Sequence, residues 1–344
     1  MSENNTKRTE LGELGEFALI ERLTKDFSAK NKSTITAIGD DAAVINNNGL
    51  ETLVSTDLFL EGIHFDLAYM PLQHLGYKSV IINISDIYAM NAVPEQITVS
   101  LGISNRFSVE ALEQFYDGVK QACKKYNVDL VGGDTTSSLK GLIISITAIG
   151  KAKKEDITYR NGAKEGDIVC VTGDLGAAFM GLQILNREKE VYAHNAAIQP
   201  DLSEHKYLVG RQLKPEANVA LINYFAKNGI KPTSMIDVSD GLSSELLHIA
   251  KQSNVGCQIF DANLPISKEV FDQAIALNID PMMCALSGGE DYELLFTIDP
   301  KDEAKLNEDE VDVTIIGKIT KKEEGCIITT ASNNNHKLIA QGWK

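Results

Sequence analysis

Acidic residues follow short apolar runs at several points along this chain. The segments TAIGDD, LVSTD, NISD and LVGGD end at Asp41, Asp57, Asp86 and Asp134, and IDVSDG and LSGGEDYE add Asp237, Asp240 and Glu290. Carboxylates that gather in one place repel each other unless cations neutralise them. Hard cations that prefer oxygen ligands, such as Mg²⁺, suit such a set and commonly arrive with a polyphosphate. The sequence therefore predicts a Mg-nucleotide enzyme.

The common glycine loops for nucleotides are missing from the sequence. No GK is followed by Ser or Thr, which excludes a Walker A loop. No two glycines are spaced as GxG, which excludes the Rossmann fingerprint and the protein-kinase glycine loop. If the chain binds ATP, metals held by carboxylates have to replace these loops.

Length, charge and cysteine content limit the possible domain number, partners and cellular location. The chain has 344 residues and a formal net charge of −15, with both halves acidic, so we expect two domains and no nucleic-acid partner. The five cysteines are far apart, and the polar N-terminus lacks a signal-peptide core, which favours a reducing cytoplasm. The longest apolar run, 77–93, is interrupted by Lys78 and Asp86, so we expect no membrane span.

Hydrophobic periodicity and turn-forming residues predict the helices and strands that position the acidic residues. We expect helices at 15–27, 74–90, 108–126, 175–186, 204–212, 216–228 and 241–253. We expect strands at 35–39, 52–56, 96–103, 128–132, 142–150 and 167–172, one running into Asp237, one in YELLFTI, and a last strand at 313–319. Residues 187–204 are polar and predict a loop. The charged, glycine-containing segment 153–167 predicts a domain boundary near residue 152. We therefore expect a disordered N-terminal segment at 1–13 and domains at 14–152 and 153–344.

At this point the motifs resemble a known family. GEFALIERL, IGDDAAVI, STDLFLEGIHF, NISDIYAMNAVPEQITVSL, VGGDTTSS, RNGAKEGD, VTGDLG, IDVSDGLSSEL and ALSGGEDYELLF occur in the order seen in thiamine-monophosphate kinases. GDDAA with GGDTT indicates only the wider superfamily of aminoimidazole-ribotide synthetase-like ATP enzymes. GEFALI, LSGGEDYEL and Trp343 after a glycine indicate the thiamine branch. The chain departs from that family in reading AMNA at 89–92 and in ending at QGWK.

The resemblance implies an α/β (α+β) fold of two domains with the aminoimidazole-ribotide synthetase-like architecture. Its N-terminal domain dimerises through a sheet, and its C-terminal α/β domain contains an antiparallel sheet. The implied reaction converts thiamine monophosphate and ATP into thiamine diphosphate and ADP in a homodimer with several Mg²⁺ ions. Because the acceptor is already a phosphate anion, no strong general base is needed, and we expect direct in-line transfer by positioning and metal electrostatics.

The resemblance also implies roles for individual residues. The implied metal ligands are Asp41, Ser55, Thr56, Asp57, Asp86, Asp134, Asp237 and Asp240. The implied nucleotide contacts are Tyr116, Gly133, Asp134, Arg160 and Ser239. The implied substrate contacts are His64, Glu290 and Trp343, the last as a stacking platform for the substrate rings.

Two other functions stay open from the sequence. One is a sister enzyme that uses ATP to activate an amide or carboxamide oxygen. The hydrogenase-maturation sister needs a C-terminal cysteine, whereas this chain ends in Lys344, and selenophosphate synthetase needs a reactive residue near the N-terminus, whereas the first cysteine is Cys123. The other is a non-catalytic protein that binds a Mg-nucleotide.

Overall fold

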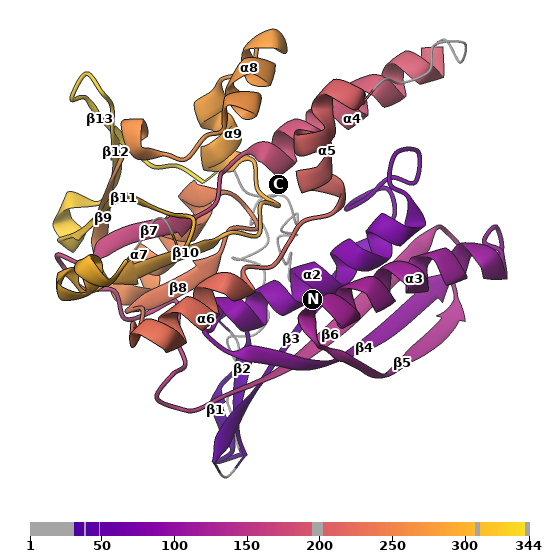
Figure 1. The fold of residues 1–344 in the computed structure, drawn as a ribbon, viewed down its shortest axis with the longest axis horizontal. Coiled ribbons are helices and arrows are strands. Elements are labelled where there is room, and N and C mark those ends of the chain that lie inside the picture. Colours follow the sequence, from indigo (N-terminus) through magenta and orange to yellow (C-terminus); the bar gives the residue numbers. More distant parts are fainter. Residues whose placement is uncertain (1–30, 38, 48, 195–201, 307–309, 341–344) are drawn as a thin grey trace, which may run out of the picture.

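Two β-sheets organise the protein, one in each half of the chain (Figure 1). The computed structural model describes residues 31–37, 39–47, 49–194, 202–306 and 310–340. The first sheet has six strands in the order β1-β2-β3-β6-β4-β5, and the second has seven in the order β13-β12-β9-β11-β7-β10-β8. None of the helices in this part of the chain combines the length and apolar composition that a bilayer span requires.

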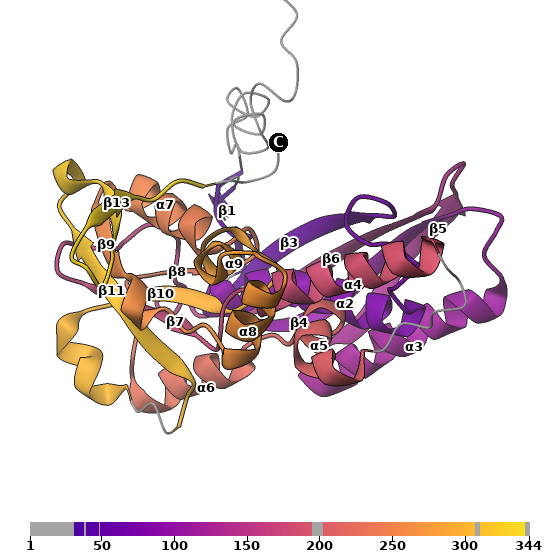
Figure 2. The ribbon, with the colours of Figure 1, turned by 90° about the horizontal axis from the view of Figure 1, so that it is seen from above.

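The first domain packs two helices on one face of its sheet (Figures 1 and 2). Its strands are antiparallel to their neighbours, except that β4 and β5 run parallel. The elements are β1 (Thr34–Thr36), β2 (Ala43–Asn47), β3 (Leu50–Leu60), α2 (Leu72–Ala89), β4 (Val93–Ile103), α3 (Val109–Tyr126), β5 (Asp129–Ser137) and β6 (Leu142–Ala152). Leu58, Leu130 and Val131 on these strands are exposed, so the sheet presents apolar side chains that no other described residue of the chain covers.

Helix α2 is the structural centre of the molecule. It is apolar on nearly all sides and buries Val80, Ile81, Ile84 and Ile87 completely, as expected for a helix with no solvent face. It contacts strands β3, β4 and β6, helix α3, and also strand β8 of the second domain. Polar side chains on the side of α2 that contacts the second domain are therefore placed at the junction of the two domains.

The second domain surrounds a mostly antiparallel sheet, in which only β9 and β12 pair in parallel. Its strands are β7 (Ile168–Thr172), β8 (Ser234–Asp237), β9 (Gly256–Phe260), β10 (Leu294–Ile298), β11 (Val313–Thr320), β12 (Cys326–Thr329) and β13 (Asn335–Lys337). Its helices are α4 (Ala177–His194), α5 (Lys206–Leu213), α6 (Val219–Asn228), α7 (Leu242–Ser253), α8 (Lys268–Ala276) and α9 (Pro281–Ser287). Short 3₁₀ turns occupy Ser203–His205, Asp261–Asn263, Pro300–Lys305 and Lys322–Glu324. Helix α4 extends alongside the first domain (Figure 2), and Lys189 there pairs with Asp66.

Several expected elements differ from the structure. The loop expected at 187–204 is wrong in its first part, because α4 continues to His194 through charged residues that are good helix formers with a solvent-exposed face. The strand expected at 313–319 is confirmed as β11, but it is not the last strand, since β12 and β13 follow. Strands β2 and β9 and helices α8 and α9 were not predicted, because they are short and their apolar pattern is weak. The expected N-terminal segment at 1–13 and helix at 15–27 lie outside the described residues.

Two glycines allow α2 and α3 to pack at backbone distance. A Cβ atom on Gly76 would lie 1.9 Å from the carbonyl oxygen of Phe115, and one on Gly118 would lie 1.9 Å from that of Gln73. Both contacts are with backbone, which cannot move aside as a flexible side chain can. The close packing therefore depends on the missing side chains.

We expect Gly76→Ala to reduce the free energy of unfolding by about 2–3 kcal/mol, because the new methyl group forces the helices apart. The matched control is Gly210→Ala in α5, where a Cβ would meet nothing within 4 Å. There alanine should be neutral or stabilise by up to about 1 kcal/mol through its higher helix propensity. Urea unfolding of both variants measures the difference, and equal stabilities would contradict the packing argument.

Candidate active site

Three carboxylates from separate parts of the chain meet where the two domains join. Asp41 precedes β2, Asp86 lies on α2 and Asp237 ends β8, and each offers an oxygen within 4.8 Å of the others. Asp41 and Asp237 are buried, whereas Asp86 keeps some exposure through an adjoining cavity. The structure thus brings together three of the residues that the sequence analysis places in one metal site.

Neighbouring polar groups fix these carboxylates. Ser55 on β3 donates a hydrogen bond to Asp86, and the Ser85 hydroxyl donates to Asp237 Oδ2 over 2.6 Å. The backbone N–H of Asp57 donates to Asn83 Oδ1 over 3.0 Å. Because Asn83, Ser85 and Asp86 share α2, this helix sets the geometry between both domains.

The electrostatics of the cluster favour a bound cation. Burial raises the pKa of Asp86 well above its ordinary value, and the charges of Asp57, Asp237 and Asp41 raise it further. Burial also raises the pKa of Asp237 to about 7, with Asp41 as the next cause. A divalent cation removes this penalty, since carboxylate and hydroxyl oxygens are the ligands that Mg²⁺ prefers. The donor set therefore fits magnesium.

These shifts predict an unusual pH dependence for the metal-free protein. The native state keeps the Asp237 proton up to a pKa of about 7, whereas the unfolded chain releases it near 3.8. Between the unfolded pKa of 3.8 and the native pKa of about 7, the native state binds more protons than the unfolded chain. Asp237 therefore lowers the free energy of unfolding as the pH rises through this range. We expect Asp237→Asn to exceed the wild type in thermal midpoint, with a larger difference at about pH 8 than at about pH 5.

The measurement is thermal unfolding of both proteins in a chelator across that pH range. Added Mg²⁺ should raise the midpoint of the wild type more than that of Asp237→Asn. A difference between the two proteins that stays constant with pH would show that Asp237 does not retain its proton on folding.

Arg160 binds the same cluster. Its Nε donates to Asp41 Oδ2 over 2.8 Å and its Nη2 to Asp41 Oδ1 over 2.9 Å, while its backbone N–H donates to Asp40. Such a two-point ion pair holds the guanidinium within the cluster. The sequence analysis expects Arg160 to contact the nucleotide, and the structure places it beside an expected metal ligand.

A cavity of about 940 Å³ opens from the cluster. The acidic and polar residues in its lining include Thr56, Asp57, Asp86, Asp237, Ser239, Asp240 and Glu290. The apolar and aromatic residues include Phe59, Ile63, Phe65, Tyr69, Ile82, Leu182 and Tyr292. This size and mixed lining suit a small organic ligand that carries a charged group.

His64 lies in the wall of this cavity. Its ring stacks on Phe59 with centroids 5.2 Å apart, and its Nδ1 accepts a hydrogen bond from the Leu60 N–H over 3.1 Å. Burial lowers the pKa of His64, which favours the neutral ring. With Nδ1 as the acceptor, the neutral tautomer carries its proton on Nε2 and can donate it to a ligand.

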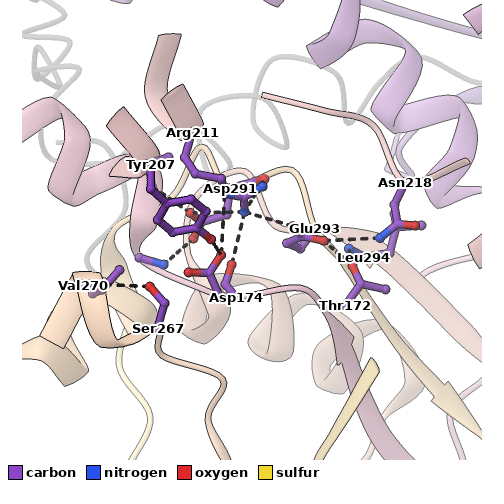
Figure 3. A network of polar contacts seen from close by, with 12 residues as sticks. Thr172, Asp174, Tyr207, Arg211, Asn218, Ser267, Val270, Asp291, Glu293 and Leu294 are labelled. Atoms are coloured by element: carbon purple, nitrogen blue, oxygen red, sulfur yellow. Dashed lines mark hydrogen bonds and ion pairs between the residues drawn. The ribbon is translucent and has the colours of Figure 1, made fainter. Parts of the chain in front are cut away.

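Glu290 reaches the cavity from a strained turn. Glu290 and Tyr292 have φ values of 60° and 53°, a left-handed conformation that is uncommon for such residues. Asp291 between them accepts hydrogen bonds from the N–H groups of Gly176 and Ala178. Arg211 donates to the Asp291 carbonyl and pairs with Glu293 at 2.9 Å (Figure 3). This network holds the turn that presents Glu290.

The structure does not bring all the expected site residues together. Asp134 and Gly133 lie on β5, and the row Asp57, Ile146, Val99, Gly133 crosses three strand pairs of the first sheet. At roughly 4.8 Å per strand, Asp134 is about 14 Å from Asp57. Gly133 lets β5 approach β4, since a Cβ there would lie 1.8 Å from the Val99 oxygen.

The remaining expected residues have the following places. Tyr116 packs edge-on against Phe115 in α3 and does not line the cavity. Thr56 donates to the Ile146 carbonyl over 3.0 Å, and the Asp240 N–H donates to buried Glu245 over 2.8 Å. Trp343 lies outside the described residues.

Sequence reasoning missed several residues at this site. Lys78, Tyr69, Gln212 and Glu245 line the cavity or contact its acidic residues. Only Lys78 carried a signal, because a charged residue inside an otherwise apolar helix needs a buried partner. Tyr69 and Gln212 lie in segments without such a pattern, and Glu245 lies within the motif IDVSDGLSSEL but was not singled out.

Two family models match the chain. The AIR synthase related protein N-terminal domain matches residues 39–152, and the corresponding C-terminal domain matches residues 164–329. Together they cover both sheets except the edge strands β1 and β13, and they contain Asp41, Asp86 and Asp237.

Full-length relatives and a solved structure are also similar. The thiamine-monophosphate kinases of Aquifex aeolicus and Bacillus subtilis are 34% and 32% identical, covering 97% and 96% of this chain and 99% of each relative. A solved structure described as AaThiL complexed with AMPPCP and TMP is 31% identical, with a TM-score of 0.84, covering 98% of this chain and 99% of that chain.

Proposed function

The chain belongs to the thiamine-monophosphate kinase family, and we infer that it transfers the γ-phosphoryl group of ATP to thiamine monophosphate, giving thiamine diphosphate and ADP. The observation that carries this function is the cavity of about 940 Å³. It joins a carboxylate cluster suited to metal-bound phosphates with an aromatic wall suited to organic rings. The complex of the related structure with a nucleotide analogue and TMP supports the same pair of substrates.

We propose that Asp41, Asp57, Asp86, Asp237 and Asp240 hold Mg²⁺ ions, with Ser55 and Thr56 beside them. Bound magnesium would neutralise the repulsion between two phosphate groups, which at about 4 Å is roughly 4 kcal/mol at an effective dielectric near 20. The chain itself orients these ligands through Ser85 and Asn83 on α2. No side chain has to accept a proton, because the attacking group is a phosphate oxygen.

We propose further that His64 and Glu290 contact thiamine monophosphate and that Arg160 and Ser239 contact ATP. His64 Nε2–H and the Glu290 carboxylate lie in the wall of one cavity, so both can reach one ligand. Trp343 and Tyr116 retain their proposed roles as a ring platform and a nucleotide contact.

We also propose that the protein is a homodimer that pairs through the first sheet. The exposed apolar residues Leu58, Leu130 and Val131 support this surface. Because Asp134 is far from Asp57 within one chain, it can join the metals only from a second copy, and we propose that it does so together with Gly133. The domain limits 14–152 and 153–344 and a cytoplasmic location remain proposals, and the five free cysteines support a reducing environment.

Formation of thiamine diphosphate from thiamine monophosphate and Mg-ATP tests the function. Activity with this acceptor would exclude a non-catalytic nucleotide-binding protein and a sister enzyme that activates an amide oxygen. Direct transfer requires both substrates at once, so initial-rate lines should intersect. Parallel lines, or an enzyme phosphorylated by ATP alone, would contradict direct transfer.

A further inference from the structure

Lys78 is a lysine with no solvent exposure, which is rare unless the charge has a partner. It lies on α2, and its Nζ pairs with Glu290 Oε1 at 2.8 Å and donates to the Gln212 carbonyl over 3.0 Å. The Glu290 side chain is 28% exposed. Lys78 is therefore on the protein side of Glu290, and the cavity is on the other side.

Glu290 is held at both carboxylate oxygens. Lys78 binds Oε1, and the Gln212 side chain donates to Oε2 over 2.8 Å. The backbone is fixed as well, because the Glu290 N–H donates to the Ser239 carbonyl over 2.8 Å. A carboxylate has about four acceptor positions, so the lone pairs that face the cavity stay available to a ligand.

The Lys78–Glu290 ion pair is oriented with its negative group toward the cavity. The ammonium of Lys78 lies behind the Glu290 carboxylate as seen from the cavity. A ligand in the cavity therefore meets the negative end of the pair first. Thiamine monophosphate carries a permanent positive charge on its thiazolium ring, which suits such a surface.

We propose that Lys78 is a positioning residue for the substrate: acting through Glu290, it fixes that carboxylate where the cationic ring of thiamine monophosphate binds. This inference rests on the proposed function. Lys78 comes from the first domain and Glu290 from the second, so the pair also sets how the domains meet at the cavity. Lys78 itself touches no reacting atom.

The test compares Lys78→Met with the wild type in the full-length protein. We expect the KM for thiamine monophosphate to rise about 10- to 100-fold, because the carboxylate loses a charged hydrogen bond and its fixed orientation. The KM for ATP should change by less than about twofold, since Lys78 contacts no residue of the acidic cluster in the described part of the chain. A merely structural tie between domains would change both values alike.

The matched control is Lys125→Met. Lys125 on α3 pairs with Glu216 at 2.7 Å and also links the first domain to the second, but neither residue lines the cavity. Its substitution should leave the KM for thiamine monophosphate unchanged. An equal rise in both lysine variants would overturn the inference in favour of a general effect of domain contacts.

A double-mutant cycle tests whether Lys78 acts through Glu290. In a Glu290→Gln background, adding Lys78→Met should change the KM for thiamine monophosphate by less than about threefold. Equal effects of Lys78→Met in both backgrounds would overturn the inference. If the wild type forms no thiamine diphosphate, the proposed function fails; if it does and Lys78→Met matches it, only the inference about Lys78 fails.

A second variant covers the case in which Lys78→Met does not fold. Lys78→Gln keeps a hydrogen-bond donor without the charge, and binding is compared for thiamine monophosphate and an analogue with a neutral thiophene ring. The wild type should prefer the cationic ring, and Lys78→Gln should lower this preference about tenfold, because the Glu290 carboxylate is no longer held in one orientation beside the ring. An unchanged preference would overturn the inference.

Discussion

Asp86→Asn is expected to lower kcat/KM for thiamine monophosphate by about a thousandfold or more while raising the thermal midpoint of the metal-free protein. The higher midpoint follows from the raised pKa of Asp86, which burial and the charges of Asp57, Asp237 and Asp41 cause. The amide keeps the shape and can still accept the Ser55 hydrogen bond. It removes one ligand charge from a metal site, and a thousandfold loss corresponds to about 4 kcal/mol of transition-state stabilisation.

Asp302→Asn is the control for this experiment. Asp302 is also buried, but it pairs with Lys305 at 2.6 Å and lies in a 3₁₀ turn away from the cavity. That substitution should lower the thermal midpoint and leave the activity unchanged. Steady-state kinetics and unfolding in a chelator measure both properties. A lower midpoint with nearly normal turnover in Asp86→Asn would show that Asp86 is structural and would remove the central ligand of the proposed site.

Local sequence was sufficient to predict the acidic residues and the elements that carry several of them. A helix was expected at 74–90 with Asp86 on it, and α2 spans Leu72–Ala89. Asp237 was expected at the end of a strand, and it ends β8. These predictions depend only on the local sequence, because carboxylates that repeatedly follow apolar runs can be recognised without knowledge of tertiary contacts.

Contacts between distant segments could not be predicted in the same way. Ser85 and Asp237 are separated by 152 residues and belong to different domains, yet they form a hydrogen bond of 2.6 Å. In the sequence, Lys78 is visible only as a charge that interrupts an apolar run. Its role depends on the ion pair with Glu290, which lies in the strained turn of the other domain. No local pattern specifies which buried charge meets which.

The separation of Asp134 from Asp57 is a third case, because sequence motifs do not say whether two residues serve one site from the same chain. Both residues follow apolar runs, and both match the same metal set. Within one chain they are about 14 Å apart, since three strand pairs lie between them. On the proposed metal role of Asp134, a complete site therefore requires the proposed homodimer.

Mixing two inactive variants tests this requirement. We expect Asp57→Asn and Asp134→Asn to be inactive alone, each with both sites of its dimer damaged. In a mixed dimer one site combines both substitutions, and the other combines the intact Asp57 of one copy with the intact Asp134 of its partner. Random pairing makes about half of the dimers mixed, each with one intact site of two, so activity should return to about a quarter of the wild type.

The control mixture is Asp57→Asn with Asp86→Asn. Asp57 and Asp86 line the same cavity of one chain, so in a mixed dimer each site carries one of the two substitutions and none is intact. Activity should stay at the level of the single variants. Co-expression with two affinity tags isolates the mixed dimers, which should then show about half of the wild-type activity with Asp134→Asn as the second variant. No recovery in these purified mixed dimers would place Asp134 outside the metal site of either copy, because geometry within one chain already keeps it from Asp57.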